Sequence, residues 1–269
     1  MARYEMARYE MARYEMSRSG IAILCLLSLC GTALPAWAAE PTAHDLVAAA
    51  IDLTRGTTSY AEMSMTIHRP EWQRSSALVA WTRGREDALI RFTAPPKDAG
   101  NATLKDDTKM WTFTPKLNRV IRLPYSMMSQ GWAGSDFSYN DLSRTDQLLH
   151  EYDLEIVETT VADSGRIYRI RATPHDDAPV VWGREELVLR DDHVLTEHTF
   201  FDQALEPIKR LEALAVATLG GRTFATRVRM NDLLEDDHWT EIEYTKAEFD
   251  IPLDDALFTV FSLQSGRQP

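Results

Sequence analysis

The side chains that most often do covalent chemistry are present in this sequence, but they do not stand at catalytic spacings. Seven histidines are spread along the chain, with no His-Glu-x-x-His helix and no Gly-x-Ser-x-Gly turn. His193 and His198 are five residues apart, which places them on opposite faces of a strand. Ser135-Asp136 lies beside a glycine but lacks a spaced base. We therefore expect no catalytic residues, and a hydrolase is kept only as an alternative hypothesis.

Paired aspartates recur along the chain and could in principle bind a cation. None of these pairs belongs to an Asp-x-Asp-x-Asp-Gly loop with a distal Glu, which calcium sites of that type require. Aspartates are typical of turns between strands. We therefore expect solvated turns, no metal site and no cofactor at the pairs Asp106-Asp107, Asp176-Asp177, Asp191-Asp192, Asp236-Asp237 and Asp254-Asp255.

The most distinctive side chains of the chain are apolar and follow a predicted hairpin. Alternating residues over 109–114 and 119–123 indicate two strands joined at Pro115–Asn118. The next segment, 124–150, is too long for an ordinary hairpin loop, and long loops on rigid sheets are usually functional. A tucked loop that seals a core is the alternative to a mobile flap. The residues that we expect to form an apolar flap over a cavity are Met127, Met128, Gly131, Trp132, Gly134 and Phe137.

The elements that must position this segment are mostly strands. Thr42 to Asp45 is typical of a helix cap, the following apolar residues have helical spacing, and Gly56 ends the predicted helix. From Ala61 onward the apolar period changes to two, which indicates strands. Short strands with brief turns indicate an antiparallel meander. Besides the hairpin, strands are predicted at 61–68, 75–81, 87–93, 154–157, 166–172, 185–190, 194–201, 208–218, 224–232 and 239–249.

A sheet of this size with so few helices must bury its apolar face by curving. We predict a mainly β (α+β) fold, in which a strongly curved antiparallel sheet forms a half-open, incomplete barrel with helices packed on its concave side. Methionine and aromatic residues suit a cavity that adapts to a ligand, although periodicity alone favours a close-packed core. The inward-facing residues that we infer are Met63, Met65, Ile67, Trp81, Ile90, Phe92, Trp111, Phe113, Val228, Met230, Ile242 and Tyr244.

Four features of the sequence carry a resemblance to a known family. They are the strand at Trp111, the turn 115–119, the Met127-Met128 pair, and Gly134-Ser-Asp-Phe137 followed by Asp141-Leu142. In these features the chain resembles the LolA-like outer membrane lipoprotein-sorting family of Gram-negative bacteria, in particular its branch associated with RND-type transporters. The resemblance implies a periplasmic carrier with a half-open barrel, and it favours an apolar cavity over a close-packed core.

The function that this resemblance implies is transport of an apolar cargo through water. We expect a monomer that binds a lipid or the acyl chains of a lipoprotein and transfers it between the inner and outer membranes. The partners would be an inner-membrane RND-type transporter and an outer-membrane acceptor of unknown identity. Lys116, Arg119 and Arg122 at the hairpin turn would meet a headgroup or a partner, unless they form a simple solvated tip. A lipid or envelope-stress sensor on the same fold is the second hypothesis.

The N-terminal part of the sequence differs in character from the rest. Residues 1–15 are three copies of Met-Ala-Arg-Tyr-Glu, which we interpret as a tag or a mis-assigned start. Residues 16–38 have the pattern of a signal peptide with cleavage near Ala38, and both cysteines of the chain lie inside it. We therefore predict export to the periplasm and a single domain over residues 39–269.

The charge of the chain restricts its partners further. The formal net charge is −12. An acidic protein repels phosphate backbones and anionic lipid surfaces. We therefore expect neither a nucleic-acid partner nor binding to an anionic membrane surface.

Overall fold

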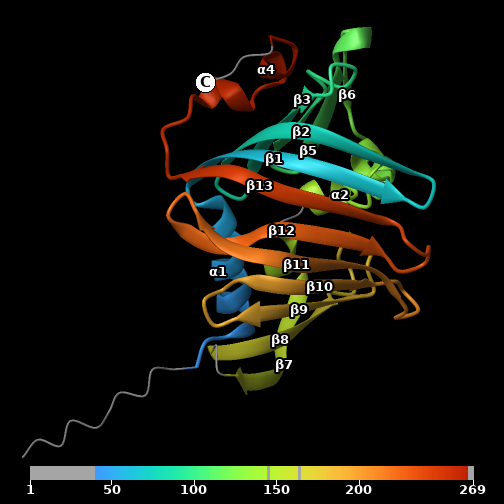
Figure 1. The fold of residues 1–269 in the computed structure, drawn as a ribbon. Helices are drawn as coiled ribbons and strands as arrows, with labels where there is room; N and C mark the ends of the chain where they lie inside the picture. The colour runs from blue at the N-terminus through green and yellow to red at the C-terminus, as the bar shows by residue number, and fades with distance from the viewer. Residues whose placement is uncertain (1–39, 144–145, 163–164, 266–269) are drawn as a thin grey trace, which may run out of the picture. The chain divides into compact units, whose positions relative to one another are not determined.

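Thirteen antiparallel strands form one sheet in the described residues of the computed structural model, 40–143, 146–162 and 165–265 (Figure 1). The order is β6-β5-β4-β3-β2-β1-β13-β12-β11-β10-β9-β8-β7, so β6 and β7 are free edges and the barrel stays open. The strands are β1 Thr58–Arg69, β2 Trp72–Arg83, β3 Asp87–Ala94, β4 Ala102–Asp106, β5 Lys109–Thr114, β6 Arg119–Arg122, β7 Tyr152–Ala162, β8 Gly165–Pro174, β9 Arg184–Arg190, β10 Leu195–Phe201, β11 Pro207–Leu219, β12 Arg222–Asp232 and β13 Trp239–Phe249.

The meander and the hairpin at Pro115–Asn118 agree with the prediction from sequence, with one strand added. β4 has no counterpart among the predicted strands, because its residues from Ala102 to Lys105 are all buried and give no alternating pattern. The predictions for residues 1–38, a tag and a signal peptide, lie outside the described residues. Helical segments are α1 Ala43–Arg55, η1 Pro115–Leu117, η2 Tyr125–Met127, η3 Trp132–Gly134, α2 Tyr139–Ser143, α3 Gln147–His150, η4 Asp255–Phe258 and α4 Val260–Ser265.

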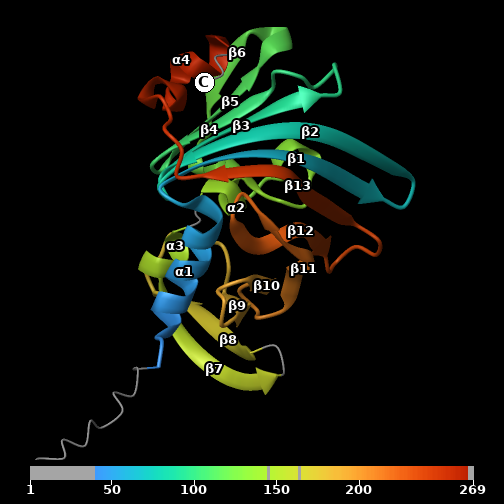
Figure 2. The ribbon, with the colours of Figure 1, turned by 60° about the vertical axis from the view of Figure 1, so that its left-hand side comes forward.

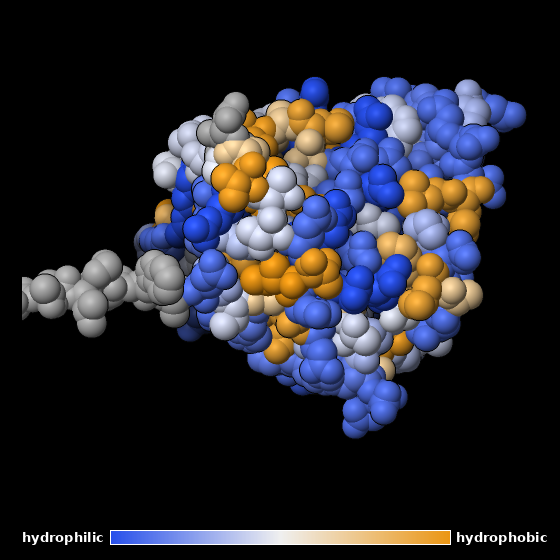
Figure 3. Space-filling view, turned by 90° about the horizontal axis from the view of Figure 1, so that it is seen from below, coloured by the Kyte–Doolittle hydropathy of each residue, from blue (hydrophilic) through white to orange (hydrophobic). Residues whose placement is uncertain are grey.

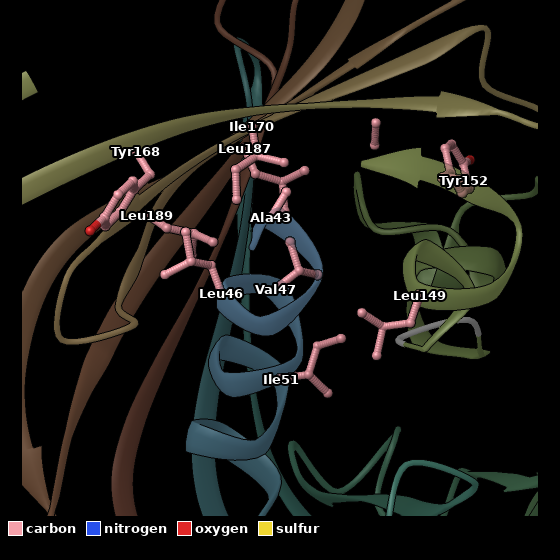
Figure 4. Packing of buried hydrophobic residues seen from close by; sticks show 11 residues of the cluster. Ala43, Leu46, Val47, Ile51, Leu149, Tyr152, Tyr168, Ile170, Leu187 and Leu189 are labelled. Carbon is pink, nitrogen blue, oxygen red and sulfur yellow. The ribbon is translucent and has the colours of Figure 1, made fainter. Parts of the chain in front are cut away.

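The curved sheet wraps around α1, α2 and α3, as expected for an incomplete barrel (Figure 2). α1 starts with a capping box, in which the Thr42 hydroxyl accepts from the Asp45 amide and the Asp45 carboxylate accepts from the Thr42 amide. Its apolar stripe then packs on β8 and β9 (Figure 4). The residues of this contact include Leu46, Val47 and Ile51 on the helix and Ile170, Leu187 and Leu189 on the strands.

A second layer covers the opposite, convex face of the sheet, which the sequence analysis does not predict. Here η4 and α4 lie against β3, β4 and β5 (Figure 2). Leu257, Phe258 and Leu263 pack on Trp81 and its neighbours. Arg91 reinforces this contact because its guanidinium donates to the carbonyl oxygen of Ser262 at 3.0 Å. The sheet therefore has buried side chains on both faces at this end.

The insertion, defined as residues 124–150, crosses the concave side between β6 and β7. It contains η2, η3, α2 and α3. Every helix in the described part of the chain is too short or too polar to cross a membrane. The insertion thus brings side chains from one long loop onto several strands at once.

Candidate functional site

The concave face of the sheet and α1 enclose a cavity of about 410 Å³. Its wall is built from α1, β1, β2, β3, the insertion and β9 to β13. Such a volume lies within the roughly 300–1,000 Å³ typical of small-molecule pockets. Most of the wall is apolar, because the strands alternate and present their apolar residues to this side.

Half of the residues predicted to face inward line this cavity. They come from strands that are neighbours in the sheet: Met63 of β1 pairs with Tyr244 of β13, and Val228 of β12 pairs with Ile242. These side chains therefore form adjacent rows across the sheet. The predicted residues on the cavity wall are Met63, Ile90, Val228, Met230, Ile242 and Tyr244.

Three further predicted residues face the concave side but lie in a filled region. Met65, Ile67 and Phe92 are buried in one cluster with Trp132 of the insertion. The Trp132 ring lies 5.5 Å from the Phe92 ring, and its Nε1 donates to Thr103 Oγ1 at 3.1 Å. Here the apolar stripe is a close-packed core, which was the alternative that periodicity favoured.

The remaining three residues require a correction. Trp81, Trp111 and Phe113 lie on the convex face, in the cluster covered by Leu257 and Phe258. The reason is the register: Met63 pairs with Leu78, so Leu78 and not Trp81 shares the concave face with it. Because both faces of β2 to β5 are buried, apolar character does not distinguish them.

The insertion contributes to the cavity wall from Trp132 onward. Trp132 and Phe137 line the cavity, and Phe137 also packs on Phe200 and Met230. Met128 is instead buried against Met110 and Leu123, with Met127 packed alongside. The methionine pair therefore does not lie over the cavity mouth, in contrast to the predicted flap.

Polar contacts hold the insertion at both sides of the concave face. Asp136 and Arg69 form an ion pair at 2.9 Å with both side chains largely buried. Arg74 donates to the carbonyl oxygen of Ala133 at 2.5 Å. Asp141 and Lys209 of β11 pair at 2.5 Å. These contacts span strands from β1 to β11, so the insertion is a strap anchored across the sheet.

The two glycines of the predicted flap are required by local geometry. A Cβ atom at Gly131 would lie 2.7 Å from the Ser135 carbonyl oxygen, which is too close. Gly134 has a φ of +75°, a conformation that favours glycine. Gly131 also forms an isolated bridge with Ser138. Their role in the structure is to form a tight turn that presents Trp132 to the cavity.

The cations of the hairpin turn lie away from the cavity. Lys116, Arg119 and Arg122 are all exposed, beside the exposed side chains of Leu117 and Ile121. Arg122 borders a second hollow of about 660 Å³ between the hairpin and α3. These residues are accessible from the surface and do not line the main cavity. On the face seen in Figure 3, hydrophobic residues gather in separate patches among hydrophilic ones.

Two groups of polar residues lie on the cavity wall, and only Tyr244 among them is predicted as a site residue from the sequence. At one end, Glu185 and His198 pair at 2.6 Å, and His198 stacks on Phe200 with ring centroids 4.0 Å apart. At the other end lie Arg55 and Tyr244. Burial lowers the pKa of the Arg55 guanidinium and raises the pKa of the Tyr244 phenol. These residues come from elements that are far apart in the sequence, so no local sequence pattern predicts that they share one cavity wall.

The site contains no arrangement suited to metal binding in the described residues. No group of three or more His, Cys, Asp or Glu side chains is placed to hold a metal ion there. What the arrangement can do is bind an apolar molecule, with hydrogen-bonding groups at two ends of the cavity.

Comparisons with known proteins agree with this fold. A family model whose description is "Uncharacterized protein" matches residues 84–265, which is more than half of the chain. A DUF1329 family protein from Desulfovibrio piger is similar at a TM-score of 0.74 and 22% identity, covering 82% of this chain and 97% of that chain. A search of curated proteins found no match.

Two further solved structures carry informative names. An outer membrane lipoprotein-sorting protein domain from Vibrio parahaemolyticus has a TM-score of 0.72 and 18% identity. The match covers 82% of this chain and 97% of that chain. A LolA superfamily protein from Nitrosomonas europaea has a TM-score of 0.68 and 18% identity over 81% and 98%. These likenesses confirm the half-open LolA-like fold that the sequence predicts.

Proposed function

The chain belongs to the family whose model matches residues 84–265, and from this and its LolA-like fold we propose that it is a periplasmic carrier of lipids or lipoprotein acyl chains. It would take its cargo into the cavity beneath α1 and transfer it between the inner and outer membranes. The observation that carries the proposal is the largely apolar cavity of about 410 Å³. The proposed wall residues include Met63, Val228 and Tyr244.

The energetics of burial support such a ligand. Each methylene removed from water contributes about 0.8 kcal/mol. At roughly 30 Å³ per carbon, close to the share of one water molecule, the cavity of about 410 Å³ has room for a chain of about 14 carbons. That chain would contribute on the order of 11 kcal/mol before the entropic and desolvation costs. This gross term favours an acyl chain in the cavity over one in water.

The size of the cavity also restricts the cargo. Three chains of that length would need roughly 1,300 Å³ at the same volume per carbon. We propose that a single chain is accommodated in the cavity as it stands, and that a lipoprotein with several acyl chains extends beyond it or displaces the strap. We propose Trp132 and Phe137 as the lid residues whose displacement would widen it, because both line the cavity from the insertion.

The proposal extends to location and partners. The signal pattern of residues 16–38 supports delivery to the periplasm, and residues 39–269 would be the carrier domain. An RND-type transporter would be the partner in the inner membrane. The exposed cations Lys116, Arg119 and Arg122 support a contact of the hairpin with an acidic surface on that partner. The proposal includes no covalent step.

The carrier function can be tested with a substitution that fills the cavity with a larger side chain. Val228 is half-buried on β12 and faces the cavity, so Val228→Trp should occupy it with an indole ring. Protein purified gently from a periplasm should yield about one bound lipid by native mass spectrometry and lipid extraction, and Val228→Trp should lose at least about nine-tenths of it.

The matched control introduces the same indole ring outside the cavity. Leu214 on β11 is exposed, so Leu214→Trp should keep the ligand. Circular dichroism of both variants reports whether the sheet is intact. A wild-type protein that carries no lipid and takes up no apolar fluorescent probe would overturn the proposal, as would a folded Val228→Trp variant that retains its full complement of ligand.

A further inference from the structure

The two polar ends of the cavity differ in how their charges are compensated. At the Glu185 end, each charged group has a partner: Glu185 pairs with His198, and Asp141 pairs with Lys209. Lys209 also lies over the Trp182 and Phe200 rings, at 4.9 and 4.8 Å. Among the described residues, the charged groups at this end are paired with one another and leave no isolated charge for a ligand to neutralise.

Arg55 at the opposite end is a buried cation without a carboxylate partner in the described part of the chain. Only 9% of the residue is exposed. Its guanidinium donates to two carbonyl oxygens, those of Gly84 at 2.8 Å and Asp87 at 3.0 Å. The Asp87 carboxylate is itself occupied by Arg83 at 2.6 Å. Buried charges in proteins are normally paired, because an unpaired one bears the full desolvation cost.

Other hydrogen-bonding groups lie on the cavity wall at the Arg55 end, while the carboxylates of Asp146, Glu86 and Asp87 act on Arg55 from beyond ion-pair distance. Tyr244 lines the wall there, and its burial raises the pKa of the phenol, so the hydroxyl remains protonated as a donor at neutral pH. Ser59 and Thr82 share a hydrogen bond of 2.6 Å at the same wall. A guanidinium beside a phenolic hydroxyl matches the two oxygens of a carboxylate.

The distance between the two ends suits an extended chain. His198 lies in the same cross-strand row as Leu211, Met230 and Thr240. Tyr244 is four residues from Thr240 along β13, about 13 Å at 3.3 Å per residue, and β10 and β13 are three strand spacings apart, about 14 Å across the sheet at 4.8 Å each, so the two ends are offset in both directions. The residues between the two ends are apolar, including Val228 and Ile242. A molecule with one anionic end and one apolar chain therefore fits this axis in a single direction.

We propose that Arg55 and Tyr244 form a headgroup site for the carboxylate of a single-chain fatty acid, whose tail occupies the apolar part of the cavity. This inference rests on the proposed carrier function and names its ligand class. Arg55 supplies the positive charge, Tyr244 supplies a neutral donor, and the self-paired groups at the far end accept no anion. The natural cargo is then a free long-chain carboxylic acid and not a neutral lipid.

The test compares one chain with and without its negative charge. Tetradecanoic acid and its methyl ester are titrated against the full protein, stripped of lipid, with the fluorescence of the cavity tryptophans Trp132 and Trp182 as the signal. The acid should bind about 10- to 100-fold more tightly than the ester, the range expected for a charge-assisted hydrogen bond. Arg55→Met should abolish that difference by weakening the acid alone.

A second variant keeps the test decisive if Arg55→Met does not fold. Tyr244→Phe removes one hydroxyl and leaves the ring in place, so it should weaken the acid by about 5-fold and leave the ester unchanged. Arg85→Met is the control, because Arg85 is an arginine of the same region that pairs with Asp52 at 2.7 Å and is not on the cavity wall.

The outcomes separate this inference from the carrier function. Equal binding of acid and ester, unchanged in Tyr244→Phe, would overturn the headgroup site and leave the carrier proposal standing. Binding of neither molecule by the wild-type protein would overturn both. Acetate, which has the headgroup without the chain, should not compete at concentrations near the dissociation constant of the acid, because the chain supplies most of the binding free energy.

Discussion

Two regions of the concave face differ, because a side chain of the insertion fills one of them and leaves the other open. In the filled region, over β1 to β4, Trp132 of the insertion packs against Met65, Ile67 and Phe92. In the open region, between α1 and β10 to β13, Val228, Ile242 and Tyr244 keep a cavity in front of them. The strands are equally apolar in both regions. The position of one tryptophan, and not strand composition, therefore separates core from cavity.

The largest expected effect is the loss of that tryptophan. Trp132→Ala should lower the free energy of unfolding by about 4 kcal/mol, because it removes a buried ring and leaves a void beside Phe92. Val228→Ala in the open region should cost about 1 kcal/mol, since its side chain already faces empty space. Urea unfolding measures both. Similar costs for the two variants would mean that the open region is packed in solution.

The second expected effect concerns the anchor of the strap. Asp136→Ala should cost about 3 kcal/mol, because it leaves Arg69 largely buried without its partner. The double variant Arg69→Met, Asp136→Ala should recover much of this loss, since it removes both charges. Chemical unfolding of all variants in a double-mutant cycle isolates the pair. An Asp136→Ala protein as stable as wild type would show that the strap is not held at this point.

The third effect distinguishes the two methionines that the sequence suggests as one flap. Met128 is buried against Met110 and Leu123, so Met128→Ala should cost about 2–3 kcal/mol. Met127 is only partly buried, so Met127→Ala should cost less than about 1 kcal/mol. Neither change should alter ligand binding, because neither residue lines the cavity. Ligand titration and unfolding on both variants check this, and lost binding with intact stability would restore the flap at this pair.

The elements of the fold could largely be predicted from the sequence, because local signals encode them. The capping box at Thr42, the turn at Pro115–Asn118 and the strand alternation all act within a few residues. β4 could not be predicted in this way, since Lys105 is buried there and donates to main-chain carbonyls of Arg85 and Glu86. Its burial depends on a turn far away in the sequence.

The candidate site could be predicted only in part, because its faces depend on register. Met63 and Tyr244 meet across β1 and β13, which are separated by most of the chain. Trp81 has the composition of a cavity residue, yet the cover formed by Phe258 makes the convex face apolar as well. Arg55 gives no sequence signal as a site residue, because a basic residue in the last turn of a helix is ordinary. Only the enclosing strands reveal its isolation.

The smallest expected effect tests whether surface polar contacts hold the open region where apolar packing does not. Asp250, at the end of β13, accepts from the Thr57 amide and hydroxyl, each at 2.9 Å, and so ties down the turn between α1 and β1. The bond from the Thr57 amide is the main cause that lowers the pKa of the Asp250 carboxyl, with Arg222 adding to it.

A carboxyl whose pKa is lower in the folded state contributes stability above its unfolded pKa of about 3.9, and that contribution is lost as the pH falls through the folded pKa. Asp250→Asn, which tolerates the positive φ of this position, should therefore melt slightly lower than wild type at pH 7 and converge with it towards pH 2. Thermal melts across this range, with Glu243→Gln on the exposed side of β13 as control, measure the convergence. A constant difference between the two proteins at every pH would assign the effect to shape and not to charge, and would leave the open region without this polar support.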